Sequence, residues 1–314
     1  MNSLVSPEKP KALHKGSQIA AIAPASPAKE ERITSGRRAL ERLGFSVAPQ
    51  RAMHPQGYFT GSPEDRRAEF LAALGDASID ALIATRGGYG SAYLLEEPLP
   101  ERLSPIKPVI GFSDLTTLQI YLWQKHHWPT FYGPMLAAGL DRGWGVVHGC
   151  DFDSFQRALI TVGSGYALDC CGHTIATGEA QGILLGGALT LVEATLGTPW
   201  ELDTTNAILV LEDRAMKPYQ IDRVLLHLKH AGKFKYVRGI ILGDFPECEP
   251  PVPGSPSVRD VAQRILAPLK IPVVFGVPIG HTARPMLTLP LGAPARLTAE
   301  GSGTLNILEP TVRP

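Results

Sequence analysis

Short apolar runs alternate with helical patterns along the first half of the chain. Runs with few polar interruptions are typical of strands buried on both faces of a sheet, and we expect them at residues 18–23, 45–48, 79–84, 108–112 and 130–132. Between these runs, apolar residues recur at helical spacing, for example at Leu115, Leu118 and Leu122. The alternation of strand and helix predicts an α/β fold with a doubly wound parallel sheet, flavodoxin-like in arrangement.

The pattern changes after residue 160. Residues 161–179 are rich in Gly, Ser, Thr and Cys and show no helical period, which indicates a domain boundary. Beyond it, strand and helix patterns begin again, and the tail holds apolar runs that we expect to pair as short antiparallel strands at 287–289, 295–297 and 305–308. We therefore expect an N-terminal α/β domain over 1–163 and a smaller C-terminal α/β domain with short antiparallel strands over 164–314, in which 164–179 is a linker.

Composition and charge argue against several classes of function. Lys and Arg number 30 and Asp and Glu number 30, so the formal net charge is zero and no basic surface for nucleic acid is indicated. Residues 1–16 are polar and lack the apolar core of a signal peptide, and no apolar run approaches membrane-spanning length. We expect a cytoplasmic protein with neither a nucleic-acid nor a membrane partner.

The cysteines predict neither disulfides nor a metal site. Four cysteines in a chain of 314 residues do not make a disulfide framework. Cys170, Cys171 and His173 form a Cys-Cys-x-His cluster, whereas zinc sites usually show Cys-x-x-Cys spacing. We expect free thiols, no metal and no cofactor.

A glycine-rich loop, Gly87-Gly88-Tyr89-Gly90, follows the strand expected at 79–84. It has neither the G-x-G-x-x-G spacing of dinucleotide-binding loops nor the Gly-Lys-Ser/Thr ending of the P-loop. Glycines at this place would let backbone N–H groups approach a ligand closely. A tight turn between a strand and a helix would explain them equally well.

Three chemically useful side chains share one position in the expected topology, the carboxyl end of a buried strand. Ser113 follows a strand and begins a helix, where it is either an N-cap or a nucleophile beside the N–H groups of the helix N-terminus. Glu212 ends the strand expected at 207–211, and His281 comes after the strand at 273–277. Ligands bind at this edge of open α/β sheets, so the three residues fit a nucleophile, an orienting acid and a base.

Neighbouring residues offer alternatives. Asp114 and Asp213 adjoin the serine and the glutamate, and each could equally cap a helix. Among the other histidines, His126 and His127 lie at the end of a helix, where a cation suits the helix dipole.

These stretches resemble the LD-carboxypeptidase family of serine peptidases, which also contains the microcin C self-immunity peptidases. The resemblance runs in the family's order along nearly the whole chain, through Ala84-Thr85-Arg86-Gly87-Gly88-Tyr89-Gly90, Gly111-Phe112-Ser113-Asp114, Leu185-Gly186-Gly187, Gly197-Thr198-Pro199, Leu211-Glu212-Asp213, Gly280-His281 and Leu287-Thr288-Leu289-Pro290-Leu291-Gly292. One departure is Ala188, where the family often has Asn.

The resemblance implies roles for the residues of the site. It implies a catalytic triad of Ser113, Glu212 and His281. It also implies an oxyanion hole formed by the backbone of Asp114 and of a glycine in the pair Gly87-Gly88.

The resemblance further implies removal of the terminal D-alanine from an L,D-linked murein tetrapeptide during cell-wall recycling, by a cytoplasmic homodimer that needs no metal. Such an enzyme must hold a free carboxylate, for which Arg86 and Arg284 are candidates. One alternative is an immunity-type peptidase that cleaves an acyl-amide of a nucleotide-bearing toxin, with Trp144 or Trp200 stacking on the base. Another is a two-domain protein that closes on a sugar or peptide without chemistry.

Overall fold

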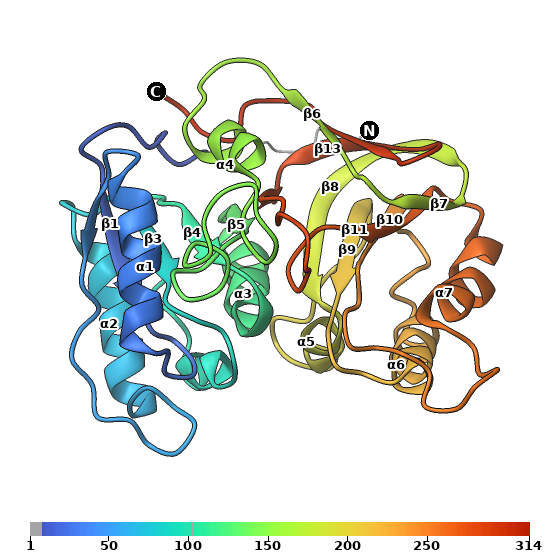
Figure 1. Cartoon of the computed structure of the whole chain (residues 1–314), viewed down its shortest axis with the longest axis horizontal. Coiled ribbons are helices and arrows are strands. Elements are labelled where there is room, and N and C mark those ends of the chain that lie inside the picture. Colours follow the sequence, from blue (N-terminus) through green and yellow to red (C-terminus); the bar gives the residue numbers. More distant parts are fainter. Residues whose placement is uncertain (1–7, 102, 104) are drawn as a thin grey trace.

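The computed structural model describes residues 8–101, 103 and 105–314, so the first seven residues of the expected N-terminal domain lie outside the description. Two sheets lie side by side, one built mainly from the first half of the chain and the other from the second half (Figure 1). Within the described part of the chain, no helix is long and apolar enough to cross a membrane.

The first sheet has the strand order β12-β5-β4-β3-β1-β2. Its parallel strands are β1 (Gln18–Ile22), β2 (Ser46–Ala48), β3 (Ala81–Ala84), β4 (Val109–Gly111) and β5 (Thr130–Tyr132). The helices between them are α1 (Glu30–Glu41), α2 (Pro63–Gly75) and α3 (Thr116–His126), with the short 3-10 helices η1 (Ser91–Leu95) and η2 (Ser113–Leu115). The order 2-1-3-4-5 is that of a flavodoxin-like sheet, which confirms the fold class predicted from the sequence.

Local sequence explains where these elements begin and what they bury. The Ser62 hydroxyl accepts a hydrogen bond from the Asp65 N–H at 3.1 Å, and Pro63 takes the first position of α2. Helix α3 is buried over residues 116–122, on every side of its first two turns, because it packs against η1 and β5 and also against β8 and α5 of the second half. Helix α3 therefore lies at the junction of the two halves.

The second sheet has the order β6-β14-β13-β8-β9-β10-β11-β7. Its central parallel strands are β8 (Gly178–Ala188), β9 (Ala207–Glu212), β10 (Gly239–Gly243) and β11 (Val273–Val277). Antiparallel strands flank them, namely β6 (Tyr166–Asp169), β7 (His173–Ala176), β13 (Pro294–Ala299) and β14 (Thr304–Ile307). The remaining helices of the chain are α4 (Phe152–Leu159), α5 (Leu189–Ala194), α6 (Pro218–His230), α7 (Val258–Leu266) and the 3-10 turn η3 (Ala267–Leu269).

Two features of the chain path differ from the expectation. Residues 164–179 are not a linker, since they form β6, β7 and the start of β8, and their mixed composition reflects half-exposed edge strands. The tail strand β12 (Leu289–Leu291) pairs antiparallel with β5, so the second half of the chain completes the sheet of the first. Periodicity along a sequence identifies a strand but does not tell which sheet it joins.

The two halves also share an apolar core. One cluster of buried side chains combines Phe112 and Tyr132 from the first half with Ile208, Ile241 and Val277 from the second. Because this cluster extends up to the strand ends that carry the candidate residues, the site has a continuous packed base across both sheets.

Candidate active site

Ser113 stands in a sharp turn between β4 and η2. Its φ of 63° lies in the left-handed region, where a residue with a Cβ is strained. Neither η2 nor α3 has a side-chain cap, so the alternative in which the Ser113 hydroxyl caps the following helix is wrong. A strained serine in a strand-to-helix turn is the arrangement that exposes a nucleophilic oxygen.

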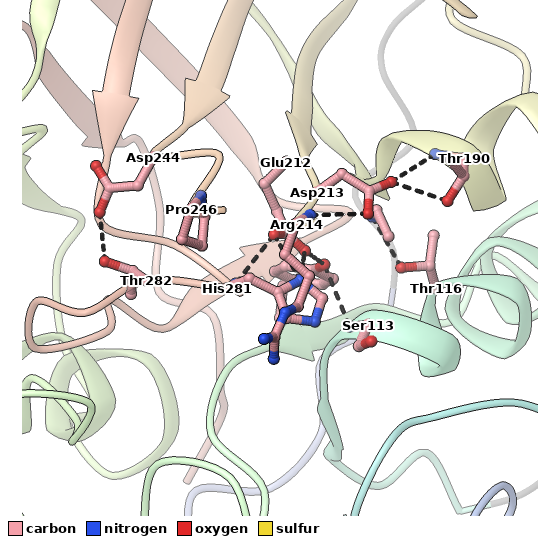
Figure 2. A network of polar contacts seen from close by, with 12 residues as sticks. Ser113, Thr116, Thr190, Glu212, Asp213, Arg214, Asp244, Pro246, His281 and Thr282 are labelled. Carbon is pink, nitrogen blue, oxygen red and sulfur yellow. Dashed lines mark hydrogen bonds and ion pairs between the residues drawn. The ribbon is translucent and has the colours of Figure 1, made fainter. Parts of the chain in front are cut away.

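Glu212 and His281 form a close pair. The Glu212 side chain is fully buried at the end of β9, and its Oε2 lies 2.9 Å from His281 Nδ1 (Figure 2). The same oxygen accepts a hydrogen bond from the His281 backbone N–H at 2.9 Å. The imidazole is therefore fixed by its Nδ1 side, and its Nε2 has no hydrogen-bond partner within the described residues.

Two glycines make room for this carboxylate. A Cβ added to Gly280, whose φ is 56°, would lie 2.5 Å from Glu212 Oε1. A Cβ added to Gly243 would lie 2.5 Å from Glu212 Cβ. The backbone before His281 wraps so closely around the carboxylate that only glycine fits there.

Charge and burial act in opposite directions on the imidazole. Burial has the largest single effect and lowers the pKa of His281, but the charge and hydrogen bond of Glu212, together with the charge of Asp213, outweigh it, so the pKa lies above its ordinary value. The Phe112 ring packs edge-on against the imidazole, with 5.1 Å between ring centroids. The imidazole is thus held in one orientation by a charge on one side and an aromatic ring on another.

Tyr132, at the end of β5, connects the acid to the serine. Its hydroxyl donates a hydrogen bond to Glu212 Oε1 at 2.5 Å and accepts one from the Ser113 backbone N–H at 3.3 Å. Burial, together with the charge of Glu212, raises the pKa of Tyr132 well above its usual range, so the phenol keeps its proton. Tyr132 was not among the residues predicted for the site, although it lies at the carboxyl end of a strand, which is the signal that pointed to Ser113, Glu212 and His281.

A cavity of about 480 Å³, here called the catalytic lobe, brings together most of the expected site. Its lining includes Ser113, His281, Asp114, Gly87, Gly88 and Arg86. A Cβ added to Gly87 would lie 3.2 Å from Ser113 Oγ and 3.4 Å from the Asp114 backbone nitrogen. The glycine loop therefore runs directly beside the serine, where a side chain would obstruct the approach of a ligand.

The neighbouring aspartates have structural contacts. Asp213 points away from the imidazole: its Oδ2 accepts hydrogen bonds from the Thr190 N–H at 3.0 Å and the Thr190 hydroxyl at 2.8 Å (Figure 2). Asp114 Oδ2 accepts a hydrogen bond from the Ser91 N–H at 2.8 Å at the start of η1. Burial raises the pKa of both carboxyls.

The two arginines expected to bind a carboxylate are placed differently. Arg86 lines the catalytic lobe and donates to the Pro27 carbonyl at 2.9 Å. Arg284 lines neither this lobe nor the cavity beside it, because Asp244 holds its guanidinium through two hydrogen bonds. Arg284 is close to His281 in the sequence but does not reach the site.

Other residues considered from the sequence lie elsewhere. Trp200 and His126 line a separate cavity with Tyr121, and Trp144 packs against Phe152 and Phe155. Across residues 8–101, 103 and 105–314 there is no group of three or more His, Cys, Asp or Glu side chains that could hold a metal ion.

Comparison with known proteins agrees with this architecture. Residues 19–133 match the family model for the LD-carboxypeptidase N-terminal domain, and residues 181–297 match that for the LD-carboxypeptidase C-terminal domain. A probable murein peptide carboxypeptidase of Bacillus subtilis is 34% identical over 303 residues, covering 95% of this chain and 94% of its own.

Solved structures show the same fold. The crystal structure of muramoyltetrapeptide carboxypeptidase from Oxalobacter formigenes superposes with a TM-score of 0.82 at 27% identity, covering 93% of this chain and 99% of that one. The microcin C7 self immunity protein MccF superposes with a TM-score of 0.89 at 24% identity over 98% of this chain and 100% of its own, a likeness of fold. From the two matching domain models and the relatives of nearly equal length, the chain belongs to the LD-carboxypeptidase family.

Proposed function

We propose that this protein is a serine carboxypeptidase that removes the terminal D-alanine from an L,D-linked murein tetrapeptide. The observation that carries the proposal is the Glu212–His281 pair, which opens with Ser113 onto one cavity. A histidine fixed by a buried carboxylate and lining one cavity with a strained serine has the composition of an acyl-transfer site. The similarity to murein and muramoyltetrapeptide carboxypeptidases supports the choice of substrate.

The proposed reaction begins with attack by Ser113 Oγ on the carbonyl carbon of the peptide bond. His281 Nε2 accepts the hydroxyl proton and then delivers it to the nitrogen of the departing D-alanine, leaving an acyl-enzyme. Water attacks the acyl-enzyme with the same histidine as base, which returns the proton to Ser113. Glu212 stays ionised and stabilises the imidazolium that forms in each half of the reaction.

Backbone N–H groups would stabilise the oxyanion of each tetrahedral intermediate. The amide of Asp114 follows the nucleophile, and the loop at Gly87-Gly88 runs beside it, which supports these groups as donors. The residues assigned to this chemistry contain no metal-ligand set, and the proposed route uses none. Arg86 stays a candidate for a substrate carboxylate in the catalytic lobe.

The two rival functions have less support. Neither Trp144 nor Trp200 lines the catalytic lobe, so the side chains considered for stacking on a nucleotide base are in the wrong place for a microcin-type substrate. A protein that only binds its ligand would have no need for a strained serine opposite a carboxylate-bound histidine.

The test is a pair of muropeptides that differ only in the configuration of the residue before the terminal D-alanine. We expect release of D-alanine from the L,D-linked peptide, none from the D,D-linked peptide, and none from an aminoacyl sulfamoyl nucleoside. Cleavage of the nucleoside in preference to the peptide would favour the microcin-type function. No turnover of any of the three would favour the non-catalytic alternative.

We also propose that the enzyme acts in the cytoplasm as a homodimer, as the family resemblance implies. Sedimentation equilibrium of the purified chain is expected to give twice the mass of one chain, and cell fractionation is expected to find it with the cytoplasmic proteins.

A further inference from the structure

A second, smaller cavity adjoins the catalytic lobe on the side of His281. It has a volume of about 280 Å³ and shares Arg32, Phe112, Ala138, Arg214 and His281 with the catalytic lobe. Ser113 does not line it. We call it the second lobe, and the histidine, not the serine, is the catalytic residue that faces it.

Two arginines of the second lobe are held by one nearly buried carboxylate. The Asp141 side chain is only 4% exposed, and its Oδ2 accepts a hydrogen bond from Arg32 Nε at 2.7 Å and lies 3.6 Å from Arg142 Nε. Because Asp141 engages both side chains through Nε, their terminal amino nitrogens remain available. These nitrogens have no hydrogen-bond partner within the described residues.

A third arginine enters from the opposite half of the molecule. Arg214 follows Glu212-Asp213 at the end of β9 and lines both lobes, as His281 does. Its charge is close enough to the imidazole to lower the pKa of His281, against the larger effect of Glu212. Arg214 forms an ion pair with Glu247, which also lines the second lobe.

The charge of this lobe favours an anion. Three guanidinium groups, those of Arg32, Arg142 and Arg214, line this lobe together with one carboxylate, that of Glu247, so positive charge is in excess among the lining side chains. Guanidinium groups with free terminal nitrogens bind carboxylates through paired, charge-assisted hydrogen bonds. Pockets for drug-sized ligands begin at about 300 Å³, so a lobe of about 280 Å³ suits one small residue.

We infer that the second lobe holds the departing D-alanine and that Arg32, Arg142 and Arg214 bind its terminal carboxylate. The inference rests on the proposed function and on one requirement of its chemistry. The imidazolium must deliver its proton to the leaving nitrogen, so the leaving residue lies on the histidine side of the serine. The lobe lined by His281 and not by Ser113 has this position, and its arginines would restrict the enzyme to chain ends.

Turnover of matched substrates tests the inference in the full-length enzyme. The substrates are the L,D-linked tetrapeptide with a free terminal carboxylate and the same peptide as its C-terminal amide, compared by kcat/KM. Loss of hydrogen bonds to a charged group predicts that the wild type prefers the acid by about 10- to 100-fold. Arg142→Gln should bring the acid-to-amide ratio close to one, and Arg142→Lys should restore part of the preference.

The matched control is Arg259→Gln, which removes an exposed arginine of α7 that lines neither lobe. It should leave both rates unchanged. Equal turnover of acid and amide by the wild type would overturn the inference. So would a fall of equal size on both substrates in Arg142→Gln.

Binding of D-alanine separates this inference from the proposed function. By calorimetry, the wild type should bind D-alanine more tightly than D-alaninamide, and Arg142→Gln should weaken the binding of D-alanine about 10-fold or more. If no peptide is cleaved while this difference in binding is found, the proposed function fails and the carboxylate site stands. If peptides are cleaved and D-alanine binds equally to both proteins, the carboxylate site fails.

Discussion

The hydroxyl of Tyr132 is the only polar group seen to contact both the acid and the backbone of the serine in the described structure, so Tyr132→Phe is an informative substitution. The change removes one oxygen atom and keeps the ring, which packs against Phe112 at 6.2 Å between centroids. Glu212 is fully buried, and within the described residues its Oε1 then loses the shorter of its two contacts and keeps only His281 Nδ1 at 3.2 Å.

The size of the effect follows from the kind of hydrogen bond that is lost. A hydrogen bond to a charged, buried group contributes about 1.5–3 kcal/mol, so we expect the free energy of unfolding to fall by about 2 kcal/mol. The longer contact of 3.3 Å to the Ser113 N–H adds little to this loss. We expect kcat to fall about 10- to 100-fold, because both the acid and the nucleophile lose a positioning contact.

The pH dependence distinguishes positioning from simple destabilisation. Without the phenol, the Glu212 carboxylate accepts one hydrogen bond fewer, so its negative charge is less stabilised and attracts the His281 proton more strongly. The pKa of His281 should therefore rise further. His281 acts as a base only when it is neutral, so the acidic limb of kcat/KM should move to higher pH.

The assay is a pH profile of kcat/KM alongside urea denaturation, with Tyr121→Phe as control. Tyr121 is also buried, but its hydroxyl accepts a hydrogen bond from the Leu99 N–H at 3.0 Å, away from the catalytic lobe. The control should lose about 1 kcal/mol of stability and keep the wild-type profile. An unshifted profile with wild-type kcat in Tyr132→Phe would refute the role given to Tyr132.

Three further predictions concern the acid, its glycine and the shared core. Glu212→Gln should reduce kcat by several orders of magnitude and Asp213→Asn much less, because Glu212 contacts His281 whereas Asp213 contacts Thr190. A larger loss of kcat in Asp213→Asn than in Glu212→Gln would contradict the assignment of Glu212 as the acid. Gly280→Ala should lower the free energy of unfolding by roughly 2–5 kcal/mol in urea denaturation, through backbone strain and overpacking against Glu212. Gly301→Ala has a similar φ but open space around it, so its stability should fall by the contribution of backbone strain alone. Equal losses in the two variants would argue against crowding at Gly280. Fragments split after residue 163 should be inactive and poorly folded apart, because they share one apolar cluster; activity of the first fragment alone would show that the base is local.

The buried strands and the candidate residues at their ends were predictable because each depends on a local pattern. Buried parallel strands are nearly continuous apolar runs, and their carboxyl ends meet at one edge of a sheet. Glu212 and His281 each follow such a run in the second sheet, so their proximity follows from topology. Ser113 follows a strand of the first sheet, and the packing of the two sheets against each other brings it to the same cavity.

What the sequence could not predict depends on direction and distant pairing. Tyr132 ends an apolar strand and looks like a core residue until its hydroxyl is seen to reach Glu212. Arg284 stands three residues after the base, but Asp244 turns it away from the cavity. Arg142 adjoins Asp141 in the sequence, but Arg32 lies on a helix 109 residues earlier, and only the fold brings it to the same carboxylate.

The central claim is that Ser113 is a nucleophile activated by His281, and labelling with a fluorophosphonate tests it most directly. Mass spectrometry of the labelled wild type should find one adduct, mapped to Ser113. The rate of D-alanine release should fall in proportion to the fraction of protein labelled. Ser113→Ala should take up no label and lose several orders of magnitude in kcat. Its free energy of unfolding should stay within about 1 kcal/mol of the wild type. Labelling at another residue, or near-normal turnover by Ser113→Ala, would contradict the account.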